Sequence, residues 1–298
     1  MSDAPALAVH SDGEPSDAWV KAFRRVLPEW TIVGSEGIAP DVAERVEAVV
    51  IWAPPRGFLG QFPRLRKIVS IGAGLDHLAS DPSRPLHVPV VPRRDPASIR
   101  AMAEFVLMQA LIHHRRIGEA IADRSAKLWR PEFRGPLAGF AVSVLGYGPM
   151  GRASAELLAQ FGCKVVAWSR TSRPNGIIPV KSGWSELDSM FSIAQILVNM
   201  LPSTPETRGL IDDRRLRLLP RGAGLINVGR ADALDQPALI RRLDAGALSL
   251  ASLDVTLVEP PEPLDPVWRH PRILLTPHIA SLPDPTSFAE WAAAEALT

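Results

Sequence analysis

The chain has 298 residues, of which 22% are charged and 46% hydrophobic, and its formal net charge is +1. This composition is typical of a globular protein of one or two domains, and the small net charge argues against binding to nucleic acid or to an anionic membrane. The sequence contains no secretory leader pattern and no apolar run of about 18 residues, so we expect a cytoplasmic protein. The single cysteine, Cys163, excludes an intramolecular disulfide and a cysteine-rich zinc site, and no metal is expected.

The first part of the chain alternates short apolar segments with helical ones. A helix is expected from Ser16, as its N-cap, to about Leu27. Short strands are expected over residues 7–10, 48–52, 66–70 and 88–91. Strands that alternate with short helices predict a small parallel α/β unit at the start of the chain.

The longest helical stretch runs from Pro96 to Gly118, and a further helical turn is expected over residues 125–129. A second α/β unit follows it. The segment from Ala141 to Trp168 has the pattern of a buried strand, a G-x-G-x-x-G turn, a helix and a second strand.

Each glycine of this turn has a separate expected role. Gly146 allows the tight turn, Gly148 lets the backbone approach a pyrophosphate, and Gly151 lets the helix pack closely on the strand. The free N–H groups at the start of the helix would then face the phosphates. Because the motif lies in its full strand–turn–helix–strand context, it predicts a dinucleotide-binding site rather than a purely structural turn.

The end of the second strand indicates which dinucleotide is bound. An NAD site usually has an acidic residue about 20 residues after the glycines, where it binds the ribose 2′-hydroxyl. Here the strand ends in polar and basic residues that suit a 2′-phosphate, namely Ser169, Arg170, Thr171 and Arg173. A solvated arginine on a loop is the alternative. We therefore expect NADP(H) to be preferred, with NAD(H) possible.

Three polar residues follow later strands, which are expected over 196–199, 224–228, 249–255 and 273–276. Arg230, Glu259 and His278 each come soon after the end of one of them. Because the carboxyl ends of parallel strands line the ligand crevice of a doubly wound sheet, we expect these side chains to converge beside the nicotinamide.

The three residue types suit hydride transfer to a 2-oxo acid. Histidine ordinarily titrates near neutral pH, so His278 could protonate the carbonyl oxygen, while Glu259 would favour its imidazolium form and fix its tautomer. Arg230 could hold the carboxylate and polarise the carbonyl. Taken singly, such residues are more often structural, but their order and positions favour catalysis. The N–H groups of residues 72–74 could also bind the carboxylate.

The motifs GYGPMG, NVGRAD, DVTLVEP, TPHIAS and SIGAGLDHL resemble those of the D-isomer-specific 2-hydroxyacid dehydrogenase family, and most of all its glyoxylate/hydroxypyruvate reductase A branch. The resemblance implies two Rossmann-like α/β domains with a cleft between them: a flavodoxin-like substrate-binding domain (residues 1–94 with 277–298) and a doubly wound NAD(P)-binding domain (95–276). It also implies a cytoplasmic homodimer.

Thr256 departs from the family's usual phenylalanine, and Trp52 and Trp129 resemble aromatic positions near the family's pocket, although core packing would explain them equally well.

The resemblance assigns roles to residues of this chain. The catalytic residues would be Arg230, Glu259 and His278. The substrate-binding residues would be Gly72, Ala73, Gly74, Arg230 and His278. The cofactor-binding residues, from the glycine motif and the resemblance together, would be Gly146, Tyr147, Gly148, Pro149, Met150, Gly151, Ser169, Arg170, Thr171, Arg173, Leu201, Pro202, Thr207, Val228, Gly229, Arg230, Asp254 and His278.

The expected function is NAD(P)H-dependent reduction of a small 2-oxo acid, either glyoxylate to glycolate or hydroxypyruvate to D-glycerate. Two alternatives stay open. One is a nucleotide-sensing binding protein with the same fold, which would not need the arginine, glutamate and histidine. The other is a D-2-hydroxyacid dehydrogenase that acts on a longer-chain acid, because the sequence does not give the size of the pocket.

Overall fold

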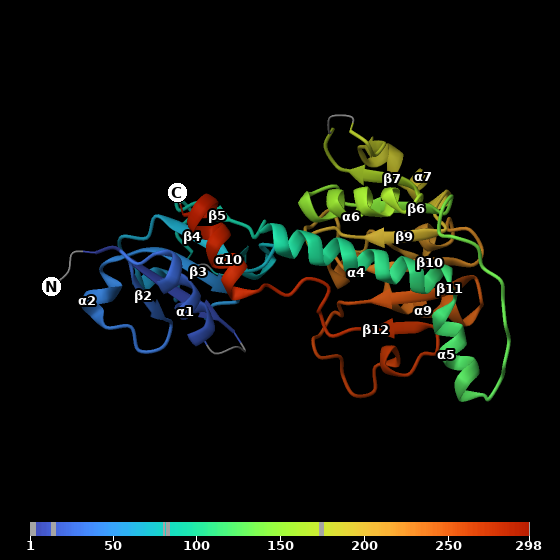
Figure 1. Ribbon diagram of the computed structural model, residues 1–298, viewed down its shortest axis with the longest axis horizontal. Coiled ribbons are helices and arrows are strands. Elements are labelled where there is room, and N and C mark those ends of the chain that lie inside the picture. Colours follow the sequence, from blue (N-terminus) through green and yellow to red (C-terminus); the bar gives the residue numbers. More distant parts are fainter. Residues whose placement is uncertain (1–3, 13–15, 80, 82–83, 173–175, 298) are drawn as a thin grey trace. The chain divides into compact units, whose positions relative to one another are not determined.

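The computed structural model describes residues 4–12, 16–79, 81, 84–172 and 176–297, and the chain forms two compact units. The first comprises Met1–Ser98 and Pro283–Thr298, and the second comprises Ile99–Leu282 (Figure 1). The sequence predicts domain boundaries between residues 94 and 95 and between residues 276 and 277. The units instead divide within the first turn of the long helix α4 (Pro96–His114) and shortly before the last helix.

The first unit contains a five-stranded sheet in the order β2-β1-β3-β4-β5, in which all neighbouring strands are parallel. This is the flavodoxin-like strand order. The strands are β1 (Ala6–Ser11), β2 (Thr31–Gly34), β3 (Val46–Trp52), β4 (Lys67–Ser70) and β5 (Val90–Val91). The helical segments are α1 (Asp17–Val26), α2 (Pro40–Ala43), η1 (Leu59–Gln61), α3 (Asp76–Ala79), α10 (Pro285–Trp291) and η5 (Ala292–Ala296).

The last helix completes the core of this first unit. Helices α1 and α10 lie side by side (Figure 1). The ring of Phe288 packs edge-on against Trp19 and Phe23, with ring centroids 5.3 and 6.3 Å apart. All three side chains are fully buried and lie in one cluster with inward-facing residues of the strands. Burial of such aromatic surface explains why the carboxyl-terminal segment joins the amino-terminal unit.

The second unit contains a seven-stranded parallel sheet in the order β12-β11-β10-β9-β6-β7-β8. Counted from β6, this is the Rossmann order with one further strand, and the order reverses between β6 and β9. The strands are β6 (Ala141–Leu145), β7 (Lys164–Ser169), β8 (Val180–Ser182), β9 (Ile196–Asn199), β10 (Ala223–Asn227), β11 (Leu248–Leu253) and β12 (Ile273–Leu275). The helical segments are α4, α5 (Ile117–Ser125), α6 (Pro149–Gln160), η2 (Trp184–Glu186), α7 (Leu187–Ser192), α8 (Asp213–Leu216), η3 (Ala231–Ala233), α9 (Gln236–Asp244) and η4 (Pro266–Trp268).

Successive strand residues of this sheet enter two different cores. Val144 packs with Val106 of α4 and Leu158 of α6 in one cluster. Leu145, the next residue, belongs to a second cluster with Leu239 of α9. Because side chains alternate across a strand, helices therefore cover both faces of the sheet, and the apolar runs of its strands are buried on both sides. Among the described residues, none of the helices combines the length and hydrophobicity that crossing a bilayer requires.

Several predicted elements differ in the structure. The expected helix 96–118 is divided at Arg116, whose φ of 54° is left-handed and whose side chain forms ion pairs with Glu119 and Glu132. The helical turn expected over 125–129 does not form, since α5 ends at Ser125. Ser16 occupies the N-cap of α1 but makes no side-chain cap hydrogen bond. The prediction also omitted β2 and β8, which are short edge strands paired on one side only.

A buried polar network joins α4 to the sheet of the second unit. The Nε2 atom of His113 lies 2.9 Å from Oγ of Ser252, whose hydroxyl donates to Oε1 of Gln109 at 2.8 Å. The ring lies over Gly224 so closely that a Cβ there would be 2.0 Å from Nδ1. Burial lowers the pKa of His113 to about 3 from an ordinary value of 6.5. The folded protein therefore holds this imidazole in its neutral form.

Acid should destabilise the protein through His113. The unfolded chain binds a proton at this histidine below pH 6.5, whereas the folded chain does so only near pH 3. The free energy of unfolding should therefore fall by about 1.4 kcal/mol per pH unit as the pH drops through this window, and be unaffected by this group above it. Urea unfolding of the wild type and of His113→Gln at several pH values measures the slope. If both proteins gave the same slope, this source of acid sensitivity would be excluded.

Candidate active site

The glycine turn after β6 has the geometry that a dinucleotide cradle requires. Gly146 has a φ of +100°, and a Cβ on Gly151 would lie 1.9 Å from the carbonyl oxygen of Gly146, so neither position tolerates a side chain. Gly148 is the N-cap of α6 and has no atom within 4 Å of where a Cβ would point. Open space thus lies beside the unpaired N–H groups of a helix start, which is where a pyrophosphate binds.

The loop after β9 lies close both to the glycine turn and to the loop after β10. A Cβ on Gly146 would be 2.9 Å from the carbonyl oxygen of Met200, and one on Gly229 would be 2.7 Å from that of Leu201. Two further predicted cofactor residues, Thr207 and Val228, are buried. The hydroxyl of Thr207 donates to the carbonyl oxygen of Pro202 at 2.6 Å, and this hydrogen bond stabilises the loop after β9. Tyr147 and Met150 are half-buried, whereas Pro149 and Pro202 are exposed.

The end of β7 carries the residues predicted to read the 2′-phosphate. Ser169 is buried, whereas Arg170 and Thr171 are exposed. Arg173 lies outside the described residues. The guanidinium of Arg170 lies 3.9 Å from the carboxylate of Glu206, a neighbour that sequence reasoning missed because it comes from a different loop. A hydrogen bond from Thr204 is the main reason why the pKa of Glu206 is lowered, and Arg170 adds to it.

The three predicted catalytic residues all lie at the carboxyl edge of the seven-stranded sheet. Arg230 follows β10, Glu259 follows β11 and His278 follows β12. The Nδ1 atom of His278 lies 2.8 Å from Oε2 of Glu259, which is a hydrogen-bond distance. The other oxygen of Glu259 accepts the backbone N–H of Thr256 at 3.1 Å. The side chains of His278 and Glu259 are 41% and 40% exposed, so a ligand can reach them.

The charge on Glu259 is stabilised by its surroundings. Partial burial alone would raise the pKa of this carboxyl, but the hydrogen bonds from His278 and from the N–H of Thr256 lower it, and so do the charges of His278 and Arg230. The net effect is a lowered pKa, so the carboxylate is ionised at neutral pH. Arg230 is therefore near enough to stabilise the negative charge of Glu259.

Two asparagines that sequence reasoning did not single out join the tips of β9 and β10. Asn199 and Asn227 are both buried, and Nδ2 of Asn199 donates to Oδ1 of Asn227 at 2.9 Å. Their side-chain oxygens also accept the N–H groups of Leu201 and Gly229, at 3.2 and 3.3 Å. The pair therefore fixes the backbone that leads to Arg230. A buried amide at the end of each of two apolar strands was the available signal.

In the first unit, the predicted carboxylate-binding loop follows β4. The N–H of Gly72 donates to Oγ of Ser70 at 3.1 Å, so the N–H groups of Ala73 and Gly74 are the better candidates for a ligand. A Cβ on Gly72 would lie 2.4 Å from the ring of Trp52, which in turn packs on a histidine of α3. The ring of Trp52 therefore packs against this loop and against α3.

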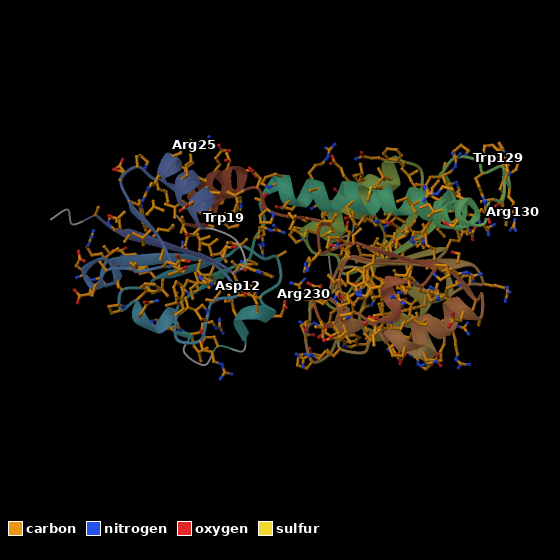
Figure 2. The ribbon with its side chains drawn as sticks, turned by 90° about the horizontal axis from the view of Figure 1, so that it is seen from below. Asp12, Trp19, Arg25, Trp129, Arg130 and Arg230 are labelled. Carbon is orange, nitrogen blue, oxygen red and sulfur yellow. The ribbon has the colours of Figure 1, made fainter. Side chains whose placement is uncertain are left out.

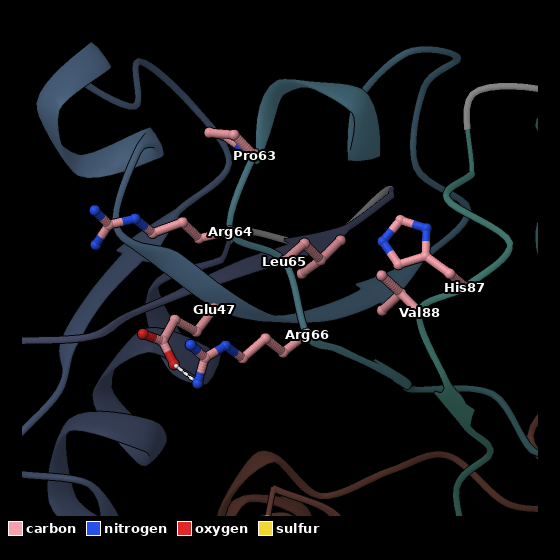
Figure 3. Close-up of a pocket in the computed structure, with 7 residues that line it drawn as sticks. All are labelled: Glu47, Pro63, Arg64, Leu65, Arg66, His87 and Val88. Carbon is pink, nitrogen blue, oxygen red and sulfur yellow. Dashed lines mark ion pairs between the residues drawn. The ribbon is translucent and has the colours of Figure 1, made fainter.

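A separate hollow of about 490 Å³ lies in the first unit, near the amino ends of β3 and β4 (Figure 3). An ion pair of 3.4 Å joins Glu47 and Arg66 on its wall. Its lining residues are Glu47, Pro63, Arg64, Leu65, Arg66, His87 and Val88. Ligands of doubly wound sheets bind at the opposite, carboxyl ends of the strands, so this hollow is not the candidate site.

These features define a class: a dinucleotide-binding α/β protein with a histidine–carboxylate pair at its strand tips. Residues 107–280 match the family model described as D-isomer specific 2-hydroxyacid dehydrogenase, NAD binding domain. The glyoxylate/hydroxypyruvate reductase A of Serratia proteamaculans is 30% identical over 287 residues, which cover 95% of this chain and 91% of that protein. The chain belongs to the D-isomer-specific 2-hydroxyacid dehydrogenase family, as predicted.

Solved structures of similar proteins agree with this assignment. A D-isomer specific 2-hydroxyacid dehydrogenase from Xanthobacter autotrophicus Py2, in complex with NADPH and MES, has a TM-score of 0.92 and 35% identity, covering 98% of this chain and 93% of that one. An NADPH-dependent glyoxylate/hydroxypyruvate reductase from Sinorhizobium meliloti, in complex with NADP and sulfate, has a TM-score of 0.88 and 28% identity, covering 98% and 94%. The predicted α/β fold class with parallel sheets is confirmed.

Proposed function

We propose that this chain is an NADPH-dependent reductase of small 2-oxo acids, with glyoxylate and hydroxypyruvate as the candidate substrates and glycolate and D-glycerate as the products. The observation that carries the proposal is the 2.8 Å contact between His278 and Glu259 at the same edge of the sheet as the open glycine turn. Relatives described as glyoxylate/hydroxypyruvate reductase A support the substrate class.

Each residue of the site would contribute one part of the reaction. NADPH, when bound along the glycine turn, supplies the hydride. His278 donates the proton of its Nε2 to the carbonyl oxygen as negative charge develops there. Glu259 accepts from Nδ1, which fixes the tautomer and stabilises the imidazolium before transfer.

Within the second unit, binding of the acid would fall to Arg230. The guanidinium of Arg230 can hold a carboxylate with two hydrogen bonds and polarise the adjacent carbonyl. Within the first unit, the N–H groups of Ala73 and Gly74 are the donors that the loop after β4 could offer to a carboxylate. Asn199 and Asn227 would keep Arg230 in place through the backbone that they bind.

The decisive test of the proposal is turnover of NADPH with a panel of 2-oxo acids. We expect the absorbance of NADPH to fall when glyoxylate or hydroxypyruvate is added, with kcat/KM lower for longer-chain acids. Tight NADPH binding without turnover of any acid would favour a nucleotide-sensing protein. A higher kcat/KM for longer-chain acids would favour a dehydrogenase of different specificity.

Arg170 should determine the preference for NADPH. Arg170→Ala is expected to lower the ratio of kcat/KM for NADPH to that for NADH by about tenfold or more, since a guanidinium–phosphate contact is lost. Fluorescence titration, which needs no turnover, should show that Arg170→Ala binds NADPH about tenfold more weakly than the wild type. Arg217→Ala is a matched control, because Arg217 is similarly exposed and pairs with Asp213 on α8. An unchanged ratio in Arg170→Ala would remove the argument for 2′-phosphate recognition.

We also propose that the protein is a cytoplasmic homodimer, as its resemblance to the family suggests. An irregular segment over residues 127–139 supports the dimer, because the side chains of Trp129 and Phe133 in it are 93% and 94% exposed. Figure 2 shows Trp129 at the opposite end of the second unit from Arg230. Such exposed aromatic surface is typical of an interface.

Sedimentation velocity tests the dimer. The double substitution Trp129→Ser with Phe133→Ser is expected to shift the protein from dimer to monomer. Ile177→Ser, at a residue that is 84% exposed in the same unit, should leave the dimer intact. A monomeric wild type, or a double variant that stays dimeric, would contradict this role of the segment.

A further inference from the structure

The side chain of Asp254, just after β11, holds the segment that carries His278. It is only 2% exposed. Its Oδ1 accepts the hydroxyl of Thr276 at 2.6 Å and the N–H of Ile279 at 2.9 Å, and its Oδ2 accepts the N–H of Ala280 at 2.9 Å. A carboxylate can accept about four hydrogen bonds, so most of its capacity is used on both sides of His278.

The backbone of His278 needs such support. Its φ of 53° lies in the left-handed region, which a residue with a Cβ adopts only when its surroundings enforce it. The N–H of His278 donates to the backbone carbonyl of Asp254 at 2.9 Å. The segment is therefore held to Asp254 before, at and after the histidine. In this conformation the imidazole reaches Glu259.

We propose that Asp254 and Thr276 are positioning residues that hold His278 in its left-handed conformation and thereby set its pairing with Glu259. The catalytic consequence rests on the function proposed above. The family resemblance gives Asp254 a second expected role, near the nicotinamide amide. The resemblance assigns no such role to Thr276, so variants of Thr276 separate positioning from cofactor binding.

The test compares conservative variants of Thr276. Thr276→Val removes the hydroxyl with little change in shape, whereas Thr276→Ser retains it. We expect kcat to fall about tenfold in Thr276→Val and to stay within about twofold in Thr276→Ser, with the Kd of NADPH within about twofold in both. Asp254→Asn places an amide donor against a backbone N–H, so its kcat should fall about a hundredfold.

A second measurement reads the geometry without turnover. In ¹H–¹⁵N NMR spectra, the Nδ1 proton of His278, identified by its absence in His278→Gln, should be visible in the wild type and in Thr276→Ser. It should be lost or weakened in Thr276→Val and Asp254→Asn. If the wild type turned over no 2-oxo acid but gave this pattern, the proposed function would fail while the positioning role stood.

Three results would contradict the positioning role. One is a Thr276→Val protein with the kcat and the Nδ1 proton of the wild type. Another is a loss of kcat in Thr276→Val that is matched by an equal weakening of NADPH binding, which would assign the segment to the cofactor instead. Equal damage in Thr276→Ser and Thr276→Val would likewise exclude the hydroxyl as the group that acts.

Discussion

Replacing His278 by alanine should lower kcat by about a thousandfold while the Kd of NADPH stays within about twofold. A general acid contributes only in the transition state, so its loss appears in kcat rather than in ground-state binding. The 2.8 Å contact with Glu259 adds to the effect, because the carboxylate stabilises the protonated ring that donates. Steady-state kinetics with glyoxylate and hydroxypyruvate, together with fluorescence titration of NADPH, measure both quantities.

The second unit offers a matched control for this substitution. The Nε2 of His270 lies 3.2 Å from Oδ1 of Asp244, so it is also a histidine beside a carboxylate. His270 precedes β12, at the amino edge of the sheet, whereas His278 follows that strand. His270→Ala should therefore keep kcat close to the wild-type value. Near-normal turnover in His278→Ala would show that another group supplies the proton.

Replacing Arg230 by alanine should raise the KM for the 2-oxo acid and lower kcat, each by about a hundredfold. A guanidinium that grips the carboxylate acts in the ground state, and its polarisation of the carbonyl acts in the transition state, so both parameters change. Loss of this cation should also weaken the electrostatic support of ionised Glu259, to which Arg230 contributes.

Arg230→Lys separates charge from geometry. Lysine keeps the positive charge but cannot form the two-pronged contact, so it should recover only part of the activity. Its KM should remain well above that of the wild type. If the KM of Arg230→Ala for the acid equalled that of the wild type, Arg230 would not be holding the carboxylate, and the acid would have to bind through other donors.

Much of the site could be predicted because its signals are local in sequence. Gly146 and Gly151 have to be glycines for reasons of φ or close approach, and Gly148 leaves open space for a ligand, so the G-x-G-x-x-G pattern can be recognised in the sequence itself. Polar residues after apolar strands mark the carboxyl edge of a parallel sheet, which is why Glu259 and His278 could be paired before any distance was known.

The remaining features depend on tertiary contacts that the sequence does not display. The helix break at Arg116 arises from a left-handed residue with charged neighbours, not from a glycine or proline. The resemblance gave Asp254 a cofactor role only; its hydrogen bonds to Thr276, Ile279 and Ala280 could not be predicted, because these residues follow a different strand. Short edge strands escape detection because a single paired side leaves little apolar pattern to recognise.

The packing of Phe288 between Trp19 and Phe23 bears on the order in which the protein is made. During synthesis, the ribosome releases every residue of the second unit before this phenylalanine emerges. The chain of the second unit is thus complete before Phe288 is added, whereas the first unit cannot complete its aromatic core until then. Loss of Phe288 would consequently damage the part of the protein that was translated first.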